Sequence, residues 1–128
     1  MQVYSFISQK GGAGKSTLAR QFAVLAGHKD STILIDRDPQ QTTAKWWNRR
    51  QDIAPAPPPQ PNLIDLQDVS LTTAIDKLRK SSITAVFIDT RPAVGEPEAE
   101  AARIADLVIV PVRPSPDDLE AVGDTLKI

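Results

Sequence analysis

The residues best suited to chemistry lie at positions 10–17, which read KGGAGKST between a short apolar run and a helical pattern. Glycines let backbone N–H groups turn toward an anion, and a helix N-terminus favours negative charge there. In such a loop Lys15 would neutralise phosphate oxygens, and the Ser16 hydroxyl would coordinate Mg²⁺. The segment therefore predicts a phosphate-binding loop, although Gln9 stands where the usual pattern has its first glycine. The alternative is a glycine-rich turn with a surface lysine.

Asp36, Asp38 and Asp89 stand just beyond two further apolar runs, residues 32–35 (TILI) and 83–88 (ITAVFI). Parallel strands place their C-terminal ends at one edge of a sheet, which is also where the phosphate loop would lie. From that edge Asp36 and Asp38 can reach a metal ion, its waters or an attacking water. Asp89 has the position of an aspartate that holds Mg²⁺ directly or through water. Asp38 is also placed to cap the helix that follows it, and the two roles are compatible.

Hydrophobic periodicity predicts the elements that would position these residues. Strands are expected over residues 3–8, 32–35, 83–88 and 107–112, with a short one at 62–66, and helices over residues 16–26, 39–50, 71–78 and 96–105 and from 117 onward. Runs that are apolar on both faces, separated by amphipathic helices, indicate an α/β fold: a mainly parallel sheet with helices on both faces. In the first helix we expect a buried face of Leu18, Phe22, Leu25 and Ala26, with Gly27 ending the helix.

Length and composition are typical of an ordinary globular domain. The chain has 128 residues, 41% hydrophobic and 24% charged, with a formal net charge of -1, so a single domain over residues 1–128 is expected. The absence of cysteine excludes disulfides, thiol catalysis, cysteine-ligated zinc and iron–sulfur clusters. His28 is the only histidine, which disfavours a histidine metal cluster or a Ser-His-Asp triad. With no signal peptide and no apolar run of about 18 residues, a cytoplasmic location is expected.

Two segments have alternative interpretations. Residues 54–61 (APAPPPQP) hold five of the eleven prolines, which excludes a helix or a central strand. They predict a stiff, extended surface connection, and a docking peptide for a proline-binding partner is the alternative. Residues 45–50 (KWWNRR) favour helix packing by the tryptophans and charge at a helix C-terminus. Nucleic-acid contact is the alternative for that segment.

The phosphate loop, with Lys10 five residues before Lys15, resembles the deviant Walker A motif of the ParA/MinD ATPases. The later segments DRDPQ, VFIDTRP and ADLVIVPVRPSPDDLEAV resemble ParA-type partition ATPases in particular, so the similarity covers nearly the whole chain. The resemblance implies a P-loop fold that binds ATP or ADP with Mg²⁺ and forms an ATP-dependent homodimer. Slow hydrolysis would then segregate or position plasmids, chromosomes or protein cargo. The alternative is a non-hydrolysing, truncated nucleotide-binding decoy or regulator of a full-length relative.

The resemblance also implies roles for individual residues. Lys10 would cross the dimer interface to the partner's phosphates, Lys15 would be the P-loop lysine, and Asp38 would position the attacking water. Ser16, Asp36 and Asp89 would form the metal shell. The nucleotide-contacting residues would be Lys10, Gly11, Gly12, Ala13, Gly14, Lys15, Ser16 and Thr17, with Pro111 and Pro114 along the adenine.

The chain departs from the family pattern at one position and in its length. Relatives often have proline where Arg91 stands, and Arg91 is either a surface charge or a group near the phosphates. Relatives also continue well beyond the helix expected at residue 117, so the chain is expected to be the N-terminal portion of such a domain, truncated at its C-terminal side. A centromere-binding or adaptor protein is the expected partner. Non-specific DNA binding, and with it nucleoid association, is expected to be weak because the chain is near neutral, and no membrane binding is expected.

Overall fold

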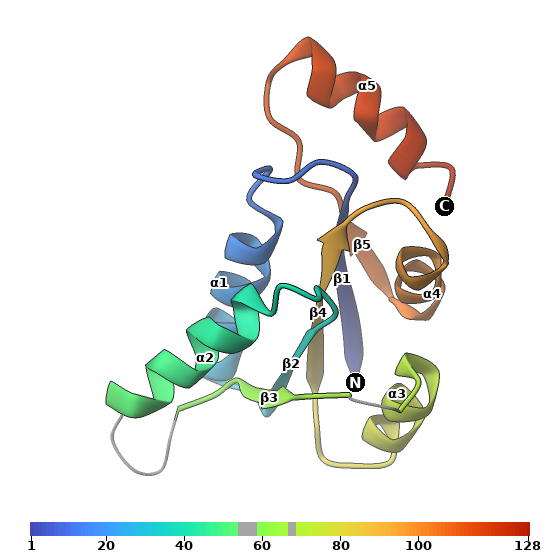
Figure 1. Ribbon diagram of the computed structural model, residues 1–128. Helices are drawn as coiled ribbons and strands as arrows, with labels where there is room; N and C mark the ends of the chain where they lie inside the picture. Colours follow the sequence, from blue (N-terminus) through green and yellow to red (C-terminus); the bar gives the residue numbers. More distant parts are fainter. Residues whose placement is uncertain (54–58, 67–68) are drawn as a thin grey trace.

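The computed structural model describes residues 1–53, 59–66 and 69–128. Within these residues lies a five-stranded sheet, all parallel, in the order β3-β2-β4-β1-β5 (Figure 1). The strands are β1 (Gln2–Ser8), β2 (Thr32–Asp36), β3 (Asn62–Ile64), β4 (Ala85–Pro92) and β5 (Leu107–Ile109). The helices are α1 (Lys15–Gly27), α2 (Thr42–Ile53), α3 (Leu71–Arg79), α4 (Glu96–Ile104) and α5 (Pro116–Thr125). The expected α/β fold with a parallel sheet is confirmed.

Helices cover both faces of this sheet. α1 and α2 lie on one face, and α3 and α4 lie on the other (Figure 1). α5 lies beyond the carboxyl ends of the strands, close to the loop that joins β1 to α1 (Figure 1). Parallel neighbours need such crossover connections, because a tight turn cannot return the chain to the starting end of the sheet.

The carboxyl ends of the central strands meet at one edge of the sheet. β4 pairs with β1 on one side and with β2 on the other, so that Asp89 lies opposite Phe6 of β1 and Asp36 of β2. Asp36 is the last residue of β2, whereas β4 continues past Asp89 to Pro92 instead of ending at residue 88 as expected; the two aspartates are register partners on adjacent strands. The loop between β1 and α1 leaves the sheet at the same edge, which is where ligands bind in open α/β sheets.

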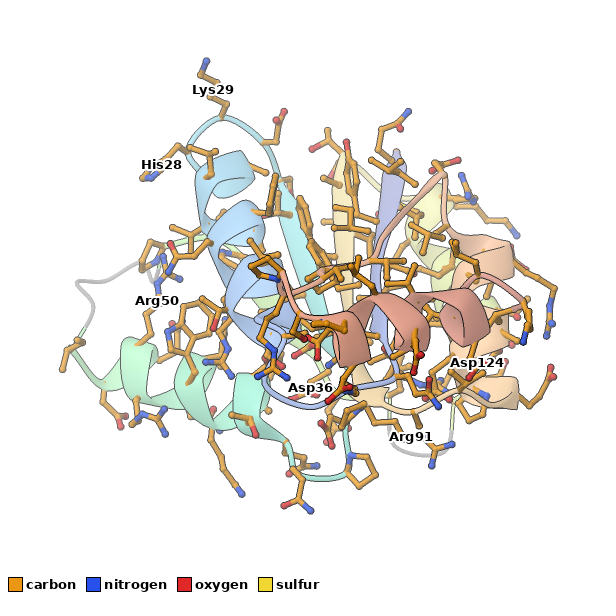
Figure 2. The ribbon with its side chains drawn as sticks, turned by 90° about the horizontal axis from the view of Figure 1, so that it is seen from above. His28, Lys29, Asp36, Arg50, Arg91 and Asp124 are labelled. Carbon is orange, nitrogen blue, oxygen red and sulfur yellow. The ribbon has the colours of Figure 1, made fainter. Side chains whose placement is uncertain are left out.

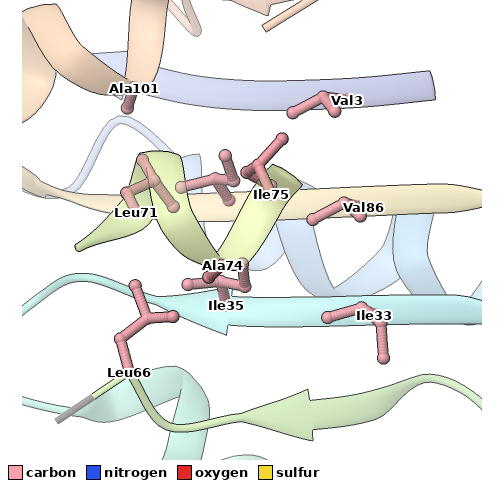
Figure 3. Packing of buried hydrophobic residues seen from close by; sticks show 10 residues of the cluster. Val3, Ile33, Ile35, Leu66, Leu71, Ala74, Ile75, Val86 and Ala101 are labelled. Carbon is pink, nitrogen blue, oxygen red and sulfur yellow. The ribbon is translucent and has the colours of Figure 1, made fainter. Parts of the chain in front are cut away.

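Two apolar clusters hold the helices to the sheet. The cluster under α3 and α4 contains Val3, Ile33, Ile35, Leu66, Leu71, Ala74, Ile75, Val86, Ile88 and Ala101 (Figure 3). The cluster under α1 contains Phe6, Ala19, Ala23, Leu34, Ala85 and Phe87. Along β2, Ile33 and Ile35 face one cluster while Leu34 faces the other, as the two-residue period of a strand requires. The strands are apolar on both sides for this reason.

The buried face of α1 differs from the one that the sequence predicts. α1 buries Lys15, Ala19 and Ala23, which are spaced four residues apart. Of the expected face, Leu18 and Ala26 are partly buried against the cluster under α1. Phe22 and Leu25 are 44% and 68% exposed, so the expectation that these two belong to the buried face is wrong. The two alanines allow the helix to lie close to the strands, and close packing outweighs the burial of the larger side chains. The same rotation turns Lys15 toward β4.

Some boundaries also differ from the expected ones. The helix expected from residue 39 begins at Thr42, because residues 38–41 form a turn in which Gln41 has a φ of 51°. The strand expected over residues 107–112 ends at Ile109, since β5 pairs only with residues 4–6 of β1. Of the proline-rich residues 54–61, only 59–61 are among the described residues, so that interpretation lies mostly outside them. No helix in the described ranges is long and apolar enough to span a membrane.

Candidate phosphate-binding site

The loop between β1 and α1 has the backbone of an anion-binding turn. Gly12 and Gly14 have φ values of 76° and 88°, a left-handed conformation that side chains with a Cβ rarely adopt. Gly14 is the N-cap residue of α1, and no side chain caps this helix end within the described residues. The first N–H groups of α1 therefore keep their capacity to donate to an anion. The loop borders a cavity of about 190 Å³ lined by Lys10, Gly11, Gly12, Ala13, Gly14, Lys15, Ser16, Thr17, Asp38 and Pro92.

Lys15 is buried at the inner end of this loop. Its ammonium donates to Asp89 Oδ1 at 3.2 Å and to the carbonyl oxygen of Thr90. These two contacts tie the first residue of α1 to β4. A buried ion pair is stable only when further hydrogen bonds complete it, and the Thr90 carbonyl supplies one of them.

Asp89 is fully buried and is held through both carboxylate oxygens. Oδ1 accepts from Lys15, and Oδ2 accepts from the Thr43 hydroxyl at 2.6 Å. Thr43 Oγ1 in turn accepts from Arg20 Nε at 3.0 Å. Sequence reasoning missed Thr43 and Arg20, because no local spacing relates them to a residue so distant in the chain. Only the packing of α2 against α1 and β4 brings the three together.

Asp36 and Asp38 lie next to each other but make different contacts. Asp36 accepts from the backbone N–H of Asp38 at 3.0 Å and from that of Ala44 at 2.9 Å. Asp38 accepts from the backbone N–H of Gln40 at 2.9 Å and lines the same cavity as the loop. Asp36, not Asp38, therefore satisfies the first turn of α2, so the capping role suggested for Asp38 is wrong. Burial raises the pKa of the Asp36 carboxyl, and the two backbone donors oppose that shift.

Lys10 contacts α5. Its Nζ lies 3.4 Å from Asp118 Oδ1, and Arg113 donates to both Asp118 oxygens, at 2.7 Å from Nε and 3.2 Å from Nη2. The Asp118 side chain is only 4% exposed, and the hydrogen bonds from Arg113 hold its pKa well below the usual range. Pro111 lines a narrow space against Lys10, whereas Pro114 is exposed and does not line it. The structure thus brings Lys10 and Pro111 together and leaves Pro114 apart from them.

Arg91 forms an ion pair with α4. Arg91 Nε donates to Glu98 Oε1 at 2.9 Å, and the Glu98 carboxylate is buried in the first turn of that helix. The pair raises the pKa of the Arg91 guanidinium. Between the two alternatives for Arg91, these contacts favour a structural charge that fixes the loop after β4.

The tryptophans of α2 are packing residues. Trp46 packs against the cluster under α1, with the guanidinium carbons of Arg20 and Arg50 lying 5.6 Å and 5.8 Å from its ring centroid. Trp47 Nε1 donates to the Pro61 carbonyl oxygen at 2.8 Å. The two rings thus join α2 to α1 and to the segment before β3, which supports the packing interpretation of residues 45–50.

The donors at this edge fit Mg²⁺ in the presence of phosphate oxygens. In the described part of the chain, no three His, Cys, Asp or Glu residues are grouped so that they could hold a metal by themselves. Mg²⁺ is usually held by one or two carboxylates together with substrate phosphates and water. Ser16 follows Lys15 at the start of α1, and Asp89 lies in β4 and also binds Lys15, so a hydroxyl and a carboxylate are available beside the loop.

The parallel sheet, the left-handed glycine loop and the buried lysine and aspartate together define a P-loop nucleotide-binding domain. The family model described as the CobQ/CobB/MinD/ParA nucleotide binding domain matches residues 4–126. The chain belongs to this family.

Two curated relatives show how much of a longer protein the chain matches. It is 30% identical over 127 residues to the maintenance of carboxysome distribution protein A of Gloeobacter kilaueensis, covering 98% of this chain and 55% of that protein. It is 28% identical over 131 residues to the protein ParA of Rhizobium radiobacter, covering 100% of this chain and 56% of that protein. The chain thus spans about half the length of the curated relatives it matches.

Solved structures share the fold. A plasmid partition protein from Borrelia burgdorferi B31 bound to AMPPNP has a TM-score of 0.78 and 20% identity, covering 98% of this chain and 68% of that one. A cobyrinic acid a,c-diamide synthase from Mycobacterium smegmatis, with a bound ATP analogue and magnesium, has a TM-score of 0.67 and 22% identity. The match covers 100% of this chain and 69% of that one. At these identities the likeness shows the fold alone.

Proposed function

We propose that residues 1–128 are an ATP-binding, slowly ATP-hydrolysing unit of a ParA-like partition ATPase. The observation that carries this proposal is the buried Lys15, held against Asp89 beneath the left-handed glycine loop. A buried ion pair is a poor way to stabilise a fold, because the desolvation of both charges offsets much of their attraction. The pair does, however, keep a cation and a carboxylate at the point where phosphate and Mg²⁺ would bind.

The residues at the sheet edge then have separate tasks. Lys15 exchanges Asp89 for phosphate oxygens, and the uncapped N–H groups of α1 donate to the same phosphates. Ser16 and Asp89 would hold Mg²⁺, with Asp36 behind them, and the ion when bound would neutralise developing phosphate charge. Asp38 lines the loop cavity and would position the attacking water.

Dimerisation and cargo are the finer part of the proposal. Lys10 would leave Asp118 and reach the phosphates of a second copy of the chain in an ATP-dependent homodimer. The family membership and the relatives that include a ParA protein support a role in positioning plasmid, chromosome or protein cargo. A centromere-binding or adaptor protein would be the partner, and contact with DNA would be non-specific and weak in a cytoplasmic setting.

The test is a titration of a fluorescent ATP analogue with Mg²⁺ present. Lys15→Ala should weaken binding at least about tenfold, or about 1.4 kcal/mol, because the main cation for phosphate is lost. Lys29→Ala is the matched control, because Lys29 lies in the turn after α1, away from Asp36 (Figure 2). The affinity of that control for the ATP analogue should stay within about twofold of the affinity of the parent chain.

A second variant guards against a folding artefact. Lys15→Ala leaves Asp89 buried without its cation, whereas Ser16→Ala leaves that ion pair intact and should weaken only the Mg²⁺-dependent part of binding. Unchanged affinity for the ATP analogue in both variants would refute the assignment of the nucleotide-binding site to this loop. Measured turnover of ATP then separates the ATPase from the non-hydrolysing nucleotide binder.

A further inference from the structure

Thr43 connects the proposed metal-binding carboxylate to a second helix. It lies in the first turn of α2 and is 0% exposed, so its hydroxyl must find partners within the protein. It donates to Asp89 Oδ2 at 2.6 Å and accepts from Arg20 Nε at 3.0 Å. The two contacts join α1, α2 and β4 at one buried point.

The direction of this hydrogen-bond chain follows from the chemistry of its members. A guanidinium N–H can only donate, so the Thr43 oxygen must accept from Arg20. The single hydroxyl proton of Thr43 is then left for Asp89, whose carboxylate oxygen accepts it. A donor that is charged polarises the hydroxyl and strengthens the bond that the hydroxyl makes to a carboxylate.

The two carboxylate oxygens of Asp89 have different hydrogen-bond partners. Oδ2 is occupied by Thr43 from α2, whereas Oδ1 is occupied by Lys15. If Lys15 turns to a phosphate, Oδ1 is the oxygen that is released, and Oδ2 stays bound to Thr43. The carboxylate therefore keeps its orientation when its other partner leaves.

Arg20 packs against an aromatic ring in addition to its hydrogen bond to Thr43. Its guanidinium carbon lies 5.6 Å from the ring centroid of Trp46 on α2. Its Nη2 is buried and makes no hydrogen bond to any residue that the structure describes. The contacts with Trp46 and Thr43 therefore fix the guanidinium so that its Nε donates to the Thr43 hydroxyl.

We propose that Thr43, oriented by Arg20, is a positioning residue that holds the Asp89 carboxylate in the orientation required for Mg²⁺ bound with nucleotide. This inference rests on the proposed ATP-binding function. Removing groups that orient a metal ligand commonly lowers metal affinity by about 10- to 100-fold without abolishing the site. The effect of Thr43 should therefore appear in the Mg²⁺ dependence of nucleotide binding and not in Mg²⁺-free binding.

The first experiment measures that Mg²⁺ dependence in four variants of the chain. Thr43→Val keeps the shape and removes the hydroxyl, Thr43→Ser restores the hydroxyl, and Arg20→Met removes the donor to Thr43. Thr42→Val is the control, because Thr42 is the exposed neighbour on the same turn. Binding of a fluorescent ATP analogue is titrated in EDTA and at stepped Mg²⁺ concentrations, with circular dichroism as the check on folding.

The expected result is a shift in the Mg²⁺ concentration that gives half of the Mg²⁺-dependent binding. Thr43→Val should raise it about tenfold and Arg20→Met at least about twofold, while affinity in EDTA stays within about twofold of the parent. The same Mg²⁺ concentration in Thr43→Ser and in Thr42→Val should lie within about twofold of that of the parent. An unchanged Mg²⁺ midpoint in Thr43→Val, or a Thr43→Ser variant as defective as Thr43→Val, would overturn the inference while leaving ATP binding by the parent intact.

The second experiment needs no nucleotide. A double-mutant cycle of Thr43→Val and Asp89→Ala in urea unfolding reports the coupling between the two side chains, because each substitution removes one partner of the hydrogen bond. A coupling of about tenfold in the unfolding equilibrium constant, or about 1.4 kcal/mol, is expected for a hydrogen bond to a charged group. No coupling overturns the inference. A parent chain that binds no ATP with or without Mg²⁺ overturns the proposed function instead, and the metal role of Thr43 with it.

Discussion

Gly27, the last residue of α1, provides a direct test of how α1 packs against the segment before β3. A Cβ added at Gly27 would lie 2.6 Å from Gln60 Cβ, 3.1 Å from the Gln60 carbonyl carbon and 3.1 Å from Thr32 Oγ1. Two of these neighbours are close to or within the main chain, so no flexible side-chain tip can move aside. Overpacking of this kind costs about 1–3 kcal/mol. The 2.6 Å approach to Gln60 Cβ places Gly27→Ala in the upper part of that range, at about 2–3 kcal/mol. The helix propensity of alanine returns up to about 1 kcal/mol, which leaves a net loss of about 1–2 kcal/mol.

Gly123 offers a matched control for Gly27→Ala. It lies inside α5, and an added Cβ would meet nothing within 4 Å, so Gly123→Ala should stabilise the chain by about 0.5–1 kcal/mol. The assay is urea unfolding followed by circular dichroism, in which the two substitutions should change the free energy of unfolding in opposite directions. Placing Gly27→Ala in a Gln60→Gly background should recover part of the loss, because the nearest atom is then absent. A Gly27→Ala chain as stable as the parent would refute the packing argument.

Three further predictions concern the site. Lys10→Ala should keep ADP binding and lose ATP-dependent dimerisation, because its proposed target is the partner's phosphate; equal dimerisation of variant and parent in light scattering would assign Lys10 to its own subunit. Asp38→Ala should bind ATP nearly normally and hydrolyse it at least about tenfold more slowly; turnover at the parent rate would shift the role to Asp36. Because Arg113 lowers the pKa of Asp118 in the folded chain, the stabilisation that Asp118 contributes is present above its ordinary pKa of 3.8 and is lost as the pH falls below that value. The difference in unfolding midpoint between the parent and Asp118→Asn should therefore shrink from about pH 5 to about pH 2, and a difference that grows with acid would contradict this.

The glycine loop and the strand-end aspartates could be predicted from the sequence because their signals are local. A glycine loop between a strand and a helix indicates an anion site whatever the rest of the chain does. Similarly, Asp36 and Asp89 each end a short run of β-forming residues, and parallel pairing then makes them neighbours on adjacent strands. The roles proposed for these residues stay predictions until they are tested.

The rotation of α1 and the contacts of α2 could not be predicted in the same way. A hydrophobicity pattern favours Phe22 and Leu25 as buried residues, whereas the structure buries Ala19 and Ala23 because they permit a closer approach to the sheet. Nothing in the sequence near Thr43 indicates that its hydroxyl reaches Asp89. Thr43 reaches Asp89 from the first turn of α2, which begins three residues after the proline at position 39, following a turn held by Asp36 and Asp38.

The strand order has a consequence for how the chain folds as it is synthesised. β1 leads the sequence, yet its neighbours in the sheet are β4 and β5, which are made last among the strands. β2 and β3 can pair early, since Ile33 and Asn62 are register partners, but β1 and the loop after it must wait for residues 85–92. Closing such distant contacts is slow, because the entropy of the intervening chain is lost before the pairing is gained. The loop and Asp89 are therefore brought together in one late step, when β4 enters between β1 and β2. A nascent chain shorter than this has no phosphate site for a nucleotide to stabilise.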